Sequence, residues 1–242
     1  MANKSYSDGD AEIPTAQDIQ TLFNRIAPVY DRVNGLMSWG RHLAWKKIAV
    51  DWATPPEGGC VLDVCCGTGD LARLLARHIG PRGKVVGLDF SEQMLEYARR
   101  KTYDPLQRQI DWVQGDALAL PFGDQTFDAT TMSFGLRNLT DLAKAFQELH
   151  RVLKPRAKAV ILDLNRTDNP NQEHFQQWYL STIVPQLGRW LNLEAEYTYI
   201  APSLERFPKG AEQIQIALGQ GFKRAIHRTV EQGAIGFLIV EA

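Results

Sequence analysis

Short apolar runs alternate with stretches whose apolar residues recur every three or four positions through the middle of the chain. Continuous apolar runs are typical of strands buried on both faces, and the wider spacing is typical of amphipathic helices. The alternation predicts βαβ units, and therefore an α/β fold with a mostly parallel sheet. The predicted strands occupy residues 60–66, 84–89, 110–116, 126–134 and 157–164.

Helices are predicted between these strands. Ser91 is a favoured N-cap residue and opens the helix that follows the second strand. Another helix covers Leu139 to Leu153, and we expect Pro155 to end it because proline lacks the N–H that a helix needs. The helix after the first strand is indicated by apolar residues at Leu71, Leu74, Leu75 and Ile79.

Three further regions surround this core of residues 60–164. Thr15 and Asp18 predict a capped helix to Ile26, and Ser38 is expected to cap another that runs to about Ala53. Residues 15–55 are therefore expected to form an N-terminal helical cap over the substrate, and residues 170–200 an amphipathic insert rich in aromatic residues. A helix near 211–218 and strands at 224–230 and 235–242 would close the sheet with an antiparallel hairpin. Residues 1–14 are expected to be disordered, and 15–242 to form one domain.

The charge balance narrows the classes of function. There are 27 Lys and Arg against 28 Asp and Glu among 242 residues, a formal net charge of -1, so no chain-wide positive field attracts nucleic acid. No uninterrupted apolar stretch approaches the ~18 residues of a membrane span, and the N-terminus has no apolar core of a signal peptide. Three cysteines without a C-x-x-C spacing give neither a disulfide framework nor a zinc site, which is consistent with a cytoplasmic protein.

A glycine turn is the clearest candidate site. The stretch VLDVCCGTGD places Gly67 and Gly69 after the first strand, where the backbone can approach a ligand closely. Asp89 ends the second strand about 20 residues further on and is placed to accept hydrogen bonds from a ribose. Both features suit a dinucleotide and an adenosyl ligand equally, so on their own they leave an NAD-dependent dehydrogenase open.

Two further acids favour a ligand without phosphate. Asp63 precedes the glycines, where a carboxylate repels a pyrophosphate but attracts the sulfonium and amino groups of S-adenosylmethionine. Asp63 is also compatible with a carboxylate that turn N–H groups satisfy. Asp116 and Ala117 follow the third strand and could bind an adenine amino group, although Asp116 could instead cap a helix.

Together, these segments resemble the class I S-adenosylmethionine-dependent methyltransferases. The stretch YDRVNGLMSWGRHLAW, with SFGLRNLTD and HRVLKP, resembles the C-methyltransferases of ubiquinone and menaquinone biosynthesis over nearly the whole chain from Leu22. The LFNRIAPVYD opening is most similar to the members that act on phytylated naphthoquinones. The resemblance implies a Rossmann-like, seven-stranded sheet and cofactor contacts at Thr68, Asp89, Asp116, Ala117 and Ser133.

The resemblance also implies a reaction. A reduced naphthoquinol with a prenyl or phytyl tail would take the methyl group on a ring carbon, as in phylloquinone or menaquinone synthesis, and no metal is needed. Arg137 is a candidate for stabilising the phenolate, or an ion pair that orients its loop, and Tyr30 and Asn138 are candidates for contacting the quinol oxygens. Asp31 is expected to pair within the N-terminal segment. His42 and Trp45 share a helix face and are interpreted first as packing residues and second as substrate contacts.

Several alternatives stay open. The ring could be a ubiquinone-type benzoquinol, the acceptor an oxygen or nitrogen, or the protein a non-catalytic adenosylmethionine-binding member of a quinone-synthesis complex. The insoluble substrate favours transient contact of the amphipathic insert with a membrane surface. Neither the oligomeric state nor the tail length is indicated. Arg156 and Ala157 replace two glycines of the family pattern, which predicts a different turn before the fifth strand, and Val33 replaces its usual Met.

Overall fold

The computed structural model describes residues 14–101, 109–167, 169–190, 193 and 197–242. The disorder expected at residues 1–14 therefore falls, except for Pro14, outside the described residues. Within them, seven strands form one sheet in the order β3-β2-β1-β4-β5-β7-β6. The first five strands in this order are parallel to one another, whereas β7 is antiparallel to β5 and to β6. The predicted fold class is confirmed. The strands are β1 (Cys60–Val64), β2 (Lys84–Asp89), β3 (Ile110–Gln114), β4 (Phe127–Ser133), β5 (Leu153–Leu164), β6 (Arg224–Val230) and β7 (Ile235–Glu241).

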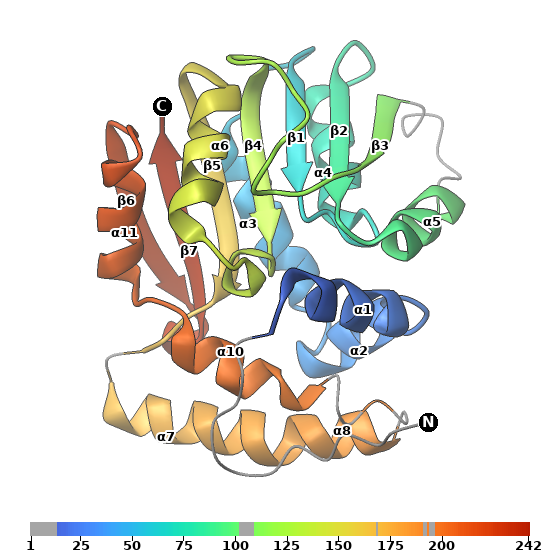
Figure 1. Cartoon of the computed structure of the whole chain (residues 1–242), viewed down its shortest axis with the longest axis vertical. Helices are drawn as coiled ribbons and strands as arrows, with labels where there is room; N and C mark the ends of the chain where they lie inside the picture. The colour runs from blue at the N-terminus through green and yellow to red at the C-terminus, as the bar shows by residue number, and fades with distance from the viewer. Residues whose placement is uncertain (1–13, 102–108, 168, 191–192, 194–196) are drawn as a thin grey trace.

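Helices cover both faces of this sheet (Figure 1). On one face lie α3 (His42–Ala53) and α4 (Asp70–Ile79), whose buried residues belong to one hydrophobic cluster. On the other lie α5 (Glu92–Arg100), α6 (Leu142–Val152) and α11 (Gly210–Gly219), each of which contributes buried apolar residues to a second cluster. Two clusters form because successive strand residues point to opposite faces, so Val61 joins the first cluster and Leu62 the second.

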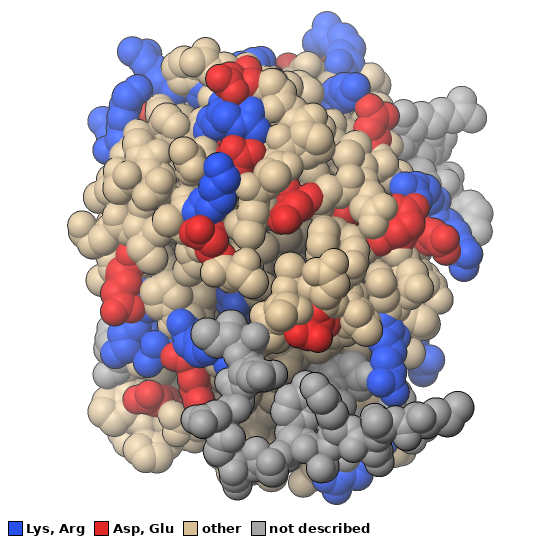
Figure 2. Space-filling view, in the orientation of Figure 1, with Lys and Arg blue, Asp and Glu red and all other residues tan. Residues whose placement is uncertain are grey.

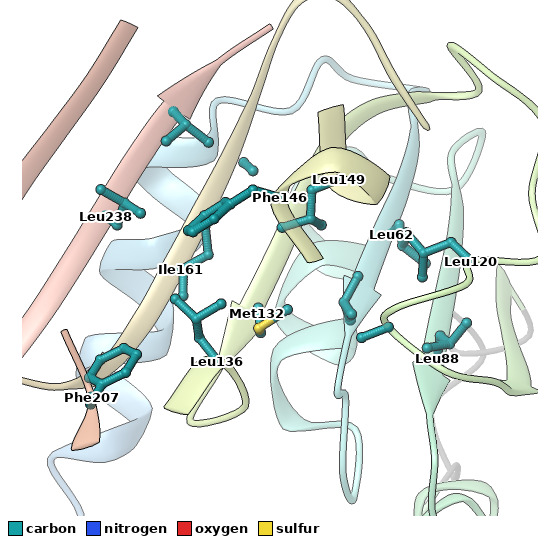
Figure 3. Close-up of a cluster of buried hydrophobic side chains, with 14 of the residues drawn as sticks. Leu62, Leu88, Leu120, Met132, Leu136, Phe146, Leu149, Ile161, Phe207 and Leu238 are labelled. Atoms are coloured by element: carbon teal, nitrogen blue, oxygen red, sulfur yellow. The ribbon is translucent and has the colours of Figure 1, made fainter. Parts of the chain in front are cut away.

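The second cluster contains side chains from α6 and from five strands. Figure 3 shows Phe146 and Leu149 of α6 facing side chains that project from neighbouring strands. Each fully buried side chain of this size contributes about 1.5–3 kcal/mol through removal of apolar surface from water. The strand side chains labelled there are Leu62, Leu88, Met132, Ile161 and Leu238.

Several helix ends were predicted correctly. α1 (Ala16–Ile26) begins with the expected capping box, in which Thr15 accepts from the Asp18 N–H and Asp18 accepts from the Thr15 N–H. Ser91 caps α5 by accepting from the Met94 N–H at 3.1 Å.

Two other ends were wrong. Ser38 does not open a helix to Ala53, because it ends α2 (Tyr30–Met37) and α3 begins four residues later. α6 ends at Val152, before Pro155 is reached, and Pro155 lies inside β5. There the pairing of β4 with β5 shifts register, so the proline sits in a bulge that needs no N–H from it.

The turn before the main part of β5 contains a left-handed residue at Arg156. Arg156 adopts φ of +67°, a conformation that glycine takes without strain, whereas Ala157 is not among the residues with positive φ. Its N–H donates to the carbonyl of Ala242 at 2.9 Å, which ties the bulge to the last described residue. A side chain costs energy at this φ, and the hydrogen bond to Ala242 offsets part of that strain.

The remaining helices gather beyond the carboxyl ends of the parallel strands (Figure 1). They include α1 and α2 from the N-terminal segment and a second group from the aromatic insert. In open α/β sheets ligands bind at this edge, near the point between β1 and β4 where the strand order reverses. The second group is α7 (Pro170–Trp178), a π-helical turn (Tyr179–Ile183), α8 (Val184–Trp190) and α10 (Ile200–Arg206).

Charges of both signs are mixed on the surface. On the face in Figure 2, Lys and Arg side chains are interspersed with Asp and Glu, and neither sign forms a continuous patch. This distribution agrees with the balanced composition and gives nucleic acid no basic surface to bind on that face.

Candidate active site

The glycine turn follows β1 directly and is built around Asp89. Gly67 and Gly69 take φ of +56° and +80°, and the Gly67 N–H donates to Asp89 Oδ2 at 2.7 Å. A Cβ on Gly69 would lie 2.2 Å from a ring atom of Trp112, so this glycine is required for packing against β3. A Cβ on Gly67 would make an ordinary contact with Tyr30 Cε1 at 3.6 Å, so the turn lies against Tyr30 at this residue.

Asp89 has spare acceptor capacity. Its Oδ1 accepts from the Ser91 N–H at 2.9 Å and its Oδ2 from the Gly67 N–H at 2.7 Å. Burial raises the pKa of Asp89 to about 6, although the N–H groups of Ser91, Gly67 and Phe90 favour the carboxylate. Two carboxylate oxygens offer about four acceptor positions, so at least one stays free to accept from a ribose hydroxyl.

A smaller cavity, of about 90 Å³, opens beside this turn. Asp116 lines it with Oδ1 accepting from the Leu118 N–H at 2.8 Å, so the acid forms a local turn and begins no helix. Helix α1 supplies part of the wall. No Lys, Arg or His is among the described residues that line this cavity, which disfavours a pyrophosphate and is compatible with a cation. Of the cofactor residues predicted from sequence, it brings together Gly67, Asp89, Asp116, Ala117 and Ser133.

The other three predicted cofactor residues lie behind the cavity. Thr68 is buried and donates through Oγ1 to Asp31 Oδ1 at 2.5 Å. Gly69 packs on Trp112 as described above. The prediction that Asp31 pairs within the N-terminal segment was wrong, since Asp31 contacts Thr68 and forms an ion pair with Lys101.

Asp63 is the third of these residues and is completely buried. Its Oδ1 accepts from Thr131 Oγ1 at 2.9 Å, and its Oδ2 has no hydrogen-bond partner among the described residues. Burial raises the pKa of Asp63 to about 7, against the opposing effects of the Thr131 hydroxyl, the Lys46 cation and the Ala72 N–H. The Ala72 N–H, in the first turn of α4, therefore helps to hold this acid, as the alternative considered from sequence expects. The buried acid is also compatible with a cationic ligand, because further positive charge nearby would favour its ionised form.

A second cavity, of about 650 Å³, lies under the N-terminal helices and the aromatic insert. Its lining is mostly apolar and aromatic, and its volume is typical of a ligand pocket. Phe23, Tyr30 and Phe134 line both cavities and therefore form the boundary between them. Two ligands bound in the two cavities would meet at these three side chains.

Arg137 lines the large cavity and is held by an acid. Its Nη1 donates to Asp163 Oδ1 at 2.5 Å and to the Phe134 carbonyl at 3.0 Å, and its Nε is buried without a described partner. Burial alone would lower the pKa of Arg137, but the Asp163 carboxylate outweighs it and raises the pKa above the ordinary value. Arg137 thus forms the orienting ion pair considered from sequence while presenting a permanent cation to the cavity.

Asn138 has a different position. It lines the smaller cavity and not the large one, and its Nδ2 donates to the Phe134 carbonyl at 3.1 Å. Both Arg137 and Asn138 therefore bind the carbonyl of the boundary residue Phe134. This places Asn138 beside the cofactor cavity, away from the region where a large apolar ligand would lie.

Two partly buried tyrosines, Tyr30 and Tyr199, lie near Arg137. Burial raises the pKa of Tyr30 well above its usual range, with Asn34 and Arg137 acting in the opposite direction. Burial likewise raises the pKa of Tyr199, and Arg137 opposes it. Both hydroxyls are therefore neutral and able to donate a hydrogen bond.

Sequence reasoning missed the boundary residues Phe23 and Phe134. Phe23 lies within the predicted helix that ends at Ile26, and nothing in its local sequence distinguishes it from a core side chain. Phe134 directly follows Ser133 at the end of β4, so its position at the strand tip was the available signal. His42 and Trp45, interpreted first as packing, both line the large cavity.

Metal and membrane signals are not found in the described part of the chain. Within residues 14–101, 109–167 and the later described segments, no three His, Cys, Asp or Glu side chains group as a metal site would require. Over the same residues, no helix combines the length and the apolar character needed to cross a bilayer.

The fold and the turn together define a class I S-adenosylmethionine-dependent methyltransferase: the sheet order, the glycine turn after β1, and the acid that ends β2. Comparison with known proteins agrees. The model of the ubiE/COQ5 methyltransferase family matches residues 12–239, and the chain belongs to this family.

Individual relatives cover almost the whole chain. A 2-phytyl-1,4-naphtoquinone methyltransferase of a Nostoc species is 50% identical over 223 residues, 92% of this chain and 97% of that protein. The chloroplastic 2-phytyl-1,4-beta-naphthoquinone methyltransferase of Arabidopsis thaliana is 41% identical over 94% of this chain and 88% of its own length. The crystal structure of an S-adenosylmethionine-dependent methyltransferase from Aquifex aeolicus shares the fold, with a TM-score of 0.60 and 22% identity over 81% of this chain and 88% of that one.

Proposed function

We propose that the protein methylates a ring carbon of a reduced naphthoquinone that carries a phytyl or prenyl tail, as in phylloquinone or menaquinone biosynthesis. The observation that carries this proposal is the large apolar cavity that meets the cofactor cavity at Tyr30. The names of the curated relatives support a phytylated naphthoquinone as the substrate.

The residues of the smaller cavity would hold the cofactor. Asp89 would bind the ribose, Asp116 and Ala117 the adenine, and the Gly67 backbone would pass alongside. Asp63 would compensate the positive charge from beneath the turn. When bound, S-adenosylmethionine supplies a methyl group that leaves a cationic sulfur.

Cofactor binding is expected to move α1. The smaller cavity, about 90 Å³, lies below the ~300–1,000 Å³ of pockets that enclose a ligand of this size. Helix α1 is attached to the segment after β2 by hydrogen bonds from Gln20 Nε2 to the Phe90 carbonyl, 2.8 Å, and from Ser91 Oγ to Asn24, 2.6 Å. Two such bonds can break or lengthen, so we expect hydrogen exchange in α1 to change when the cofactor binds.

The quinol side would be handled by Arg137 and Tyr30. A quinone ring carbon is electrophilic, whereas a quinol that loses a phenolic proton to water becomes electron-rich at the neighbouring carbon, so the substrate must be reduced. Arg137 would stabilise the phenolate, and the neutral Tyr30 hydroxyl would donate to a ring oxygen. Asn138 would position Phe134 rather than contact the quinol. The N-terminal helices would act as the cap that excludes water.

The aromatic insert would take the tail. A long isoprenoid gains about 0.8 kcal/mol for each buried CH₂. Trp39, which lines the large cavity, is 89% exposed, and Trp190 on α8 is 80% exposed. Phe175 and Trp178 on α7 are also exposed and lie 5.8 Å apart between ring centroids. We propose that these side chains contact a membrane surface, where aromatic rings are favoured and where the lipophilic quinol resides.

The test is direct. The purified protein is incubated with methyl-labelled S-adenosylmethionine and demethylphylloquinone, with and without a reductant, and the product is analysed by mass spectrometry. Ring methylation in the reduced sample alone supports the proposal. Cofactor binding without methylation of the naphthoquinol would refute it, and benzoquinols would be tried next.

A further inference from the structure

The most informative side chain outside this scheme is His42, at the start of α3. It is buried and lines the large cavity together with Tyr30, Asn34 and Ser38. Tyr30 and Asn34 belong to α2, Ser38 ends that helix and His42 begins α3, so the junction of the two helices supplies part of the cavity wall.

The hydrogen bonds of Ser38 fix the tautomer of His42. Ser38 Oγ lies 2.6 Å from the Asn34 carbonyl, to which it can only donate, and 2.7 Å from His42 Nδ1. A hydroxyl has one hydrogen, so Ser38 must accept from His42, and Nδ1 must carry the proton. The lone pair is then on Nε2. No described residue forms a hydrogen bond with Nε2, and Nε2 is not among the fully buried atoms that lack a partner.

The surrounding charges keep this imidazole neutral. Burial lowers the pKa of His42, the Lys46 cation lowers it further, and Asp70 acts against both. Lys46 and Asp70 form their own ion pair at 3.1 Å, and Arg41 pairs with Glu231 at 2.7 Å at the same cavity. A neutral imidazole with an open Nε2 is a proton acceptor.

The proposed reaction needs such an acceptor. The ring carbon that receives the methyl group still holds its hydrogen, and the quinol becomes aromatic again only when that proton leaves. Tyr30 is protonated and Arg137 is a permanent cation, so neither can take it.

We propose that His42 Nε2 accepts this ring proton. The carbon–hydrogen bond breaks, its electron pair restores the aromatic ring and converts the ring carbonyl to a phenolate, and the proton forms a bond to Nε2. The imidazolium later releases the proton to water, while the phenolate is protonated. Ser38 is the positioning residue. The inference rests on the proposed function, because a ring proton is lost only in C-methylation.

The first experiment compares His42→Gln with the wild-type protein on demethylphylloquinol. Glutamine keeps the polar volume but cannot take a proton, so we expect kcat to fall about 10²-fold or more. The Kd of S-adenosylmethionine, from calorimetry, should change less than about twofold. A substrate deuterated at the reacting ring carbon should show a larger isotope effect with His42→Gln than with wild type, a change that a packing role would not cause. His78→Gln, an exposed histidine on α4, is the matched control.

A second measurement needs no variant. Nitrogen-15 NMR of the histidine-labelled wild-type protein without cofactor should show His42 as the Nδ1–H tautomer, with the Nε2 signal shifting when menadiol is added. An Nε2–H tautomer, a kcat of His42→Gln within threefold of wild type, or an unchanged isotope effect would overturn the assignment. A wild-type protein that methylates no quinol would instead refute the proposed function itself, so the two failures are distinguishable.

Discussion

The buried ion pair of Arg137 and Asp163 allows a quantitative test of how the substrate side of the site is held. Asp163 accepts from Arg137 Nη1 at 2.5 Å, from the Arg137 backbone N–H at 3.2 Å and from the Leu164 N–H at 2.8 Å. The two side chains are only 7% and 4% exposed, so water cannot replace either partner. The perturbation is a set of three variants: Asp163→Leu, Arg137→Met and the double substitution.

The magnitudes follow from what each variant leaves behind. Asp163→Leu leaves a guanidinium buried and unpaired, which costs about 3–5 kcal/mol of a total stability of about 5–15 kcal/mol. Arg137→Met leaves the Asp163 carboxylate with two hydrogen-bond donors, the backbone N–H groups of residues 137 and 164. Its cost is therefore smaller, about 1–3 kcal/mol. The double variant buries no charge and should be more stable than Asp163→Leu, with a coupling energy of about 1–3 kcal/mol.

The assay is urea unfolding at pH 7, followed by far-UV circular dichroism and extrapolated linearly to water. Asp124→Asn is the control, because Asp124 forms an ion pair with Arg151 but its side chain is 75% exposed, and the expected cost is below about 1 kcal/mol. If the two single substitutions added to give the double value, or if Asp163→Leu cost no more than Asp124→Asn, the pair would not be holding Arg137. All three Arg137 and Asp163 variants should also lose methylation activity.

Three other predictions concern the glycine turn and the surface. The pKa of Asp63 is about 7 in the folded protein against an ordinary value of 3.8, so between these two pH values the folded state holds the extra proton and stability falls as pH rises. Asp63→Asn should flatten the pH dependence of the urea-unfolding free energy between pH 4 and 7, and an unchanged slope would contradict the assignment. Gly69→Ala should destabilise by at least about 1–3 kcal/mol in thermal unfolding, through the clash with Trp112 and the positive φ, and a smaller loss would show that the turn can relax. Replacing Trp39 and Trp190 by serine should reduce sedimentation with lipid vesicles several-fold without lowering stability, and equal sedimentation would rule out this contact surface.

The sheet could be predicted from sequence because its signal is local. Each strand of the parallel sheet is a short apolar run, and the helix ends at Thr15 and Ser91 depend on hydrogen bonds within three residues. The errors occurred where contacts between residues far apart in the sequence determine the backbone conformation or the partner of a side chain. The φ of +67° at Arg156 depends on a hydrogen bond to Ala242, and the role of Asp31 depends on Thr68, which is 37 residues away.

The candidate site was only partly predictable for the same reason. Sequence spacing brought Asp89 and Gly67 together correctly, since a strand and the turn beside it have fixed geometry. It could not separate Asp63, which lies beneath the turn, and Thr68, whose side chain is buried within it, from residues that line the cavity. Nor could it place Asn138 beside the cofactor cavity, because a single residue of helical rotation after β4 decides which cavity a side chain lines.

The distribution of charge across the boundary is the feature that links the fold to the proposed chemistry. Acids lie on the cofactor side, with Asp89 and Asp116 lining the smaller cavity and Asp63 below it, whereas Arg137 lines the large cavity and Tyr30 stands between them. On the proposed function, positive charge leaves the cofactor side as the methyl group departs, and negative charge on the quinol oxygen must be supported until that transfer. Charged groups of opposite sign on the two sides favour binding of both reactants. Arg137, Asp89 and Asp116 require little reorganisation, because each is held by hydrogen bonds before the ligands bind.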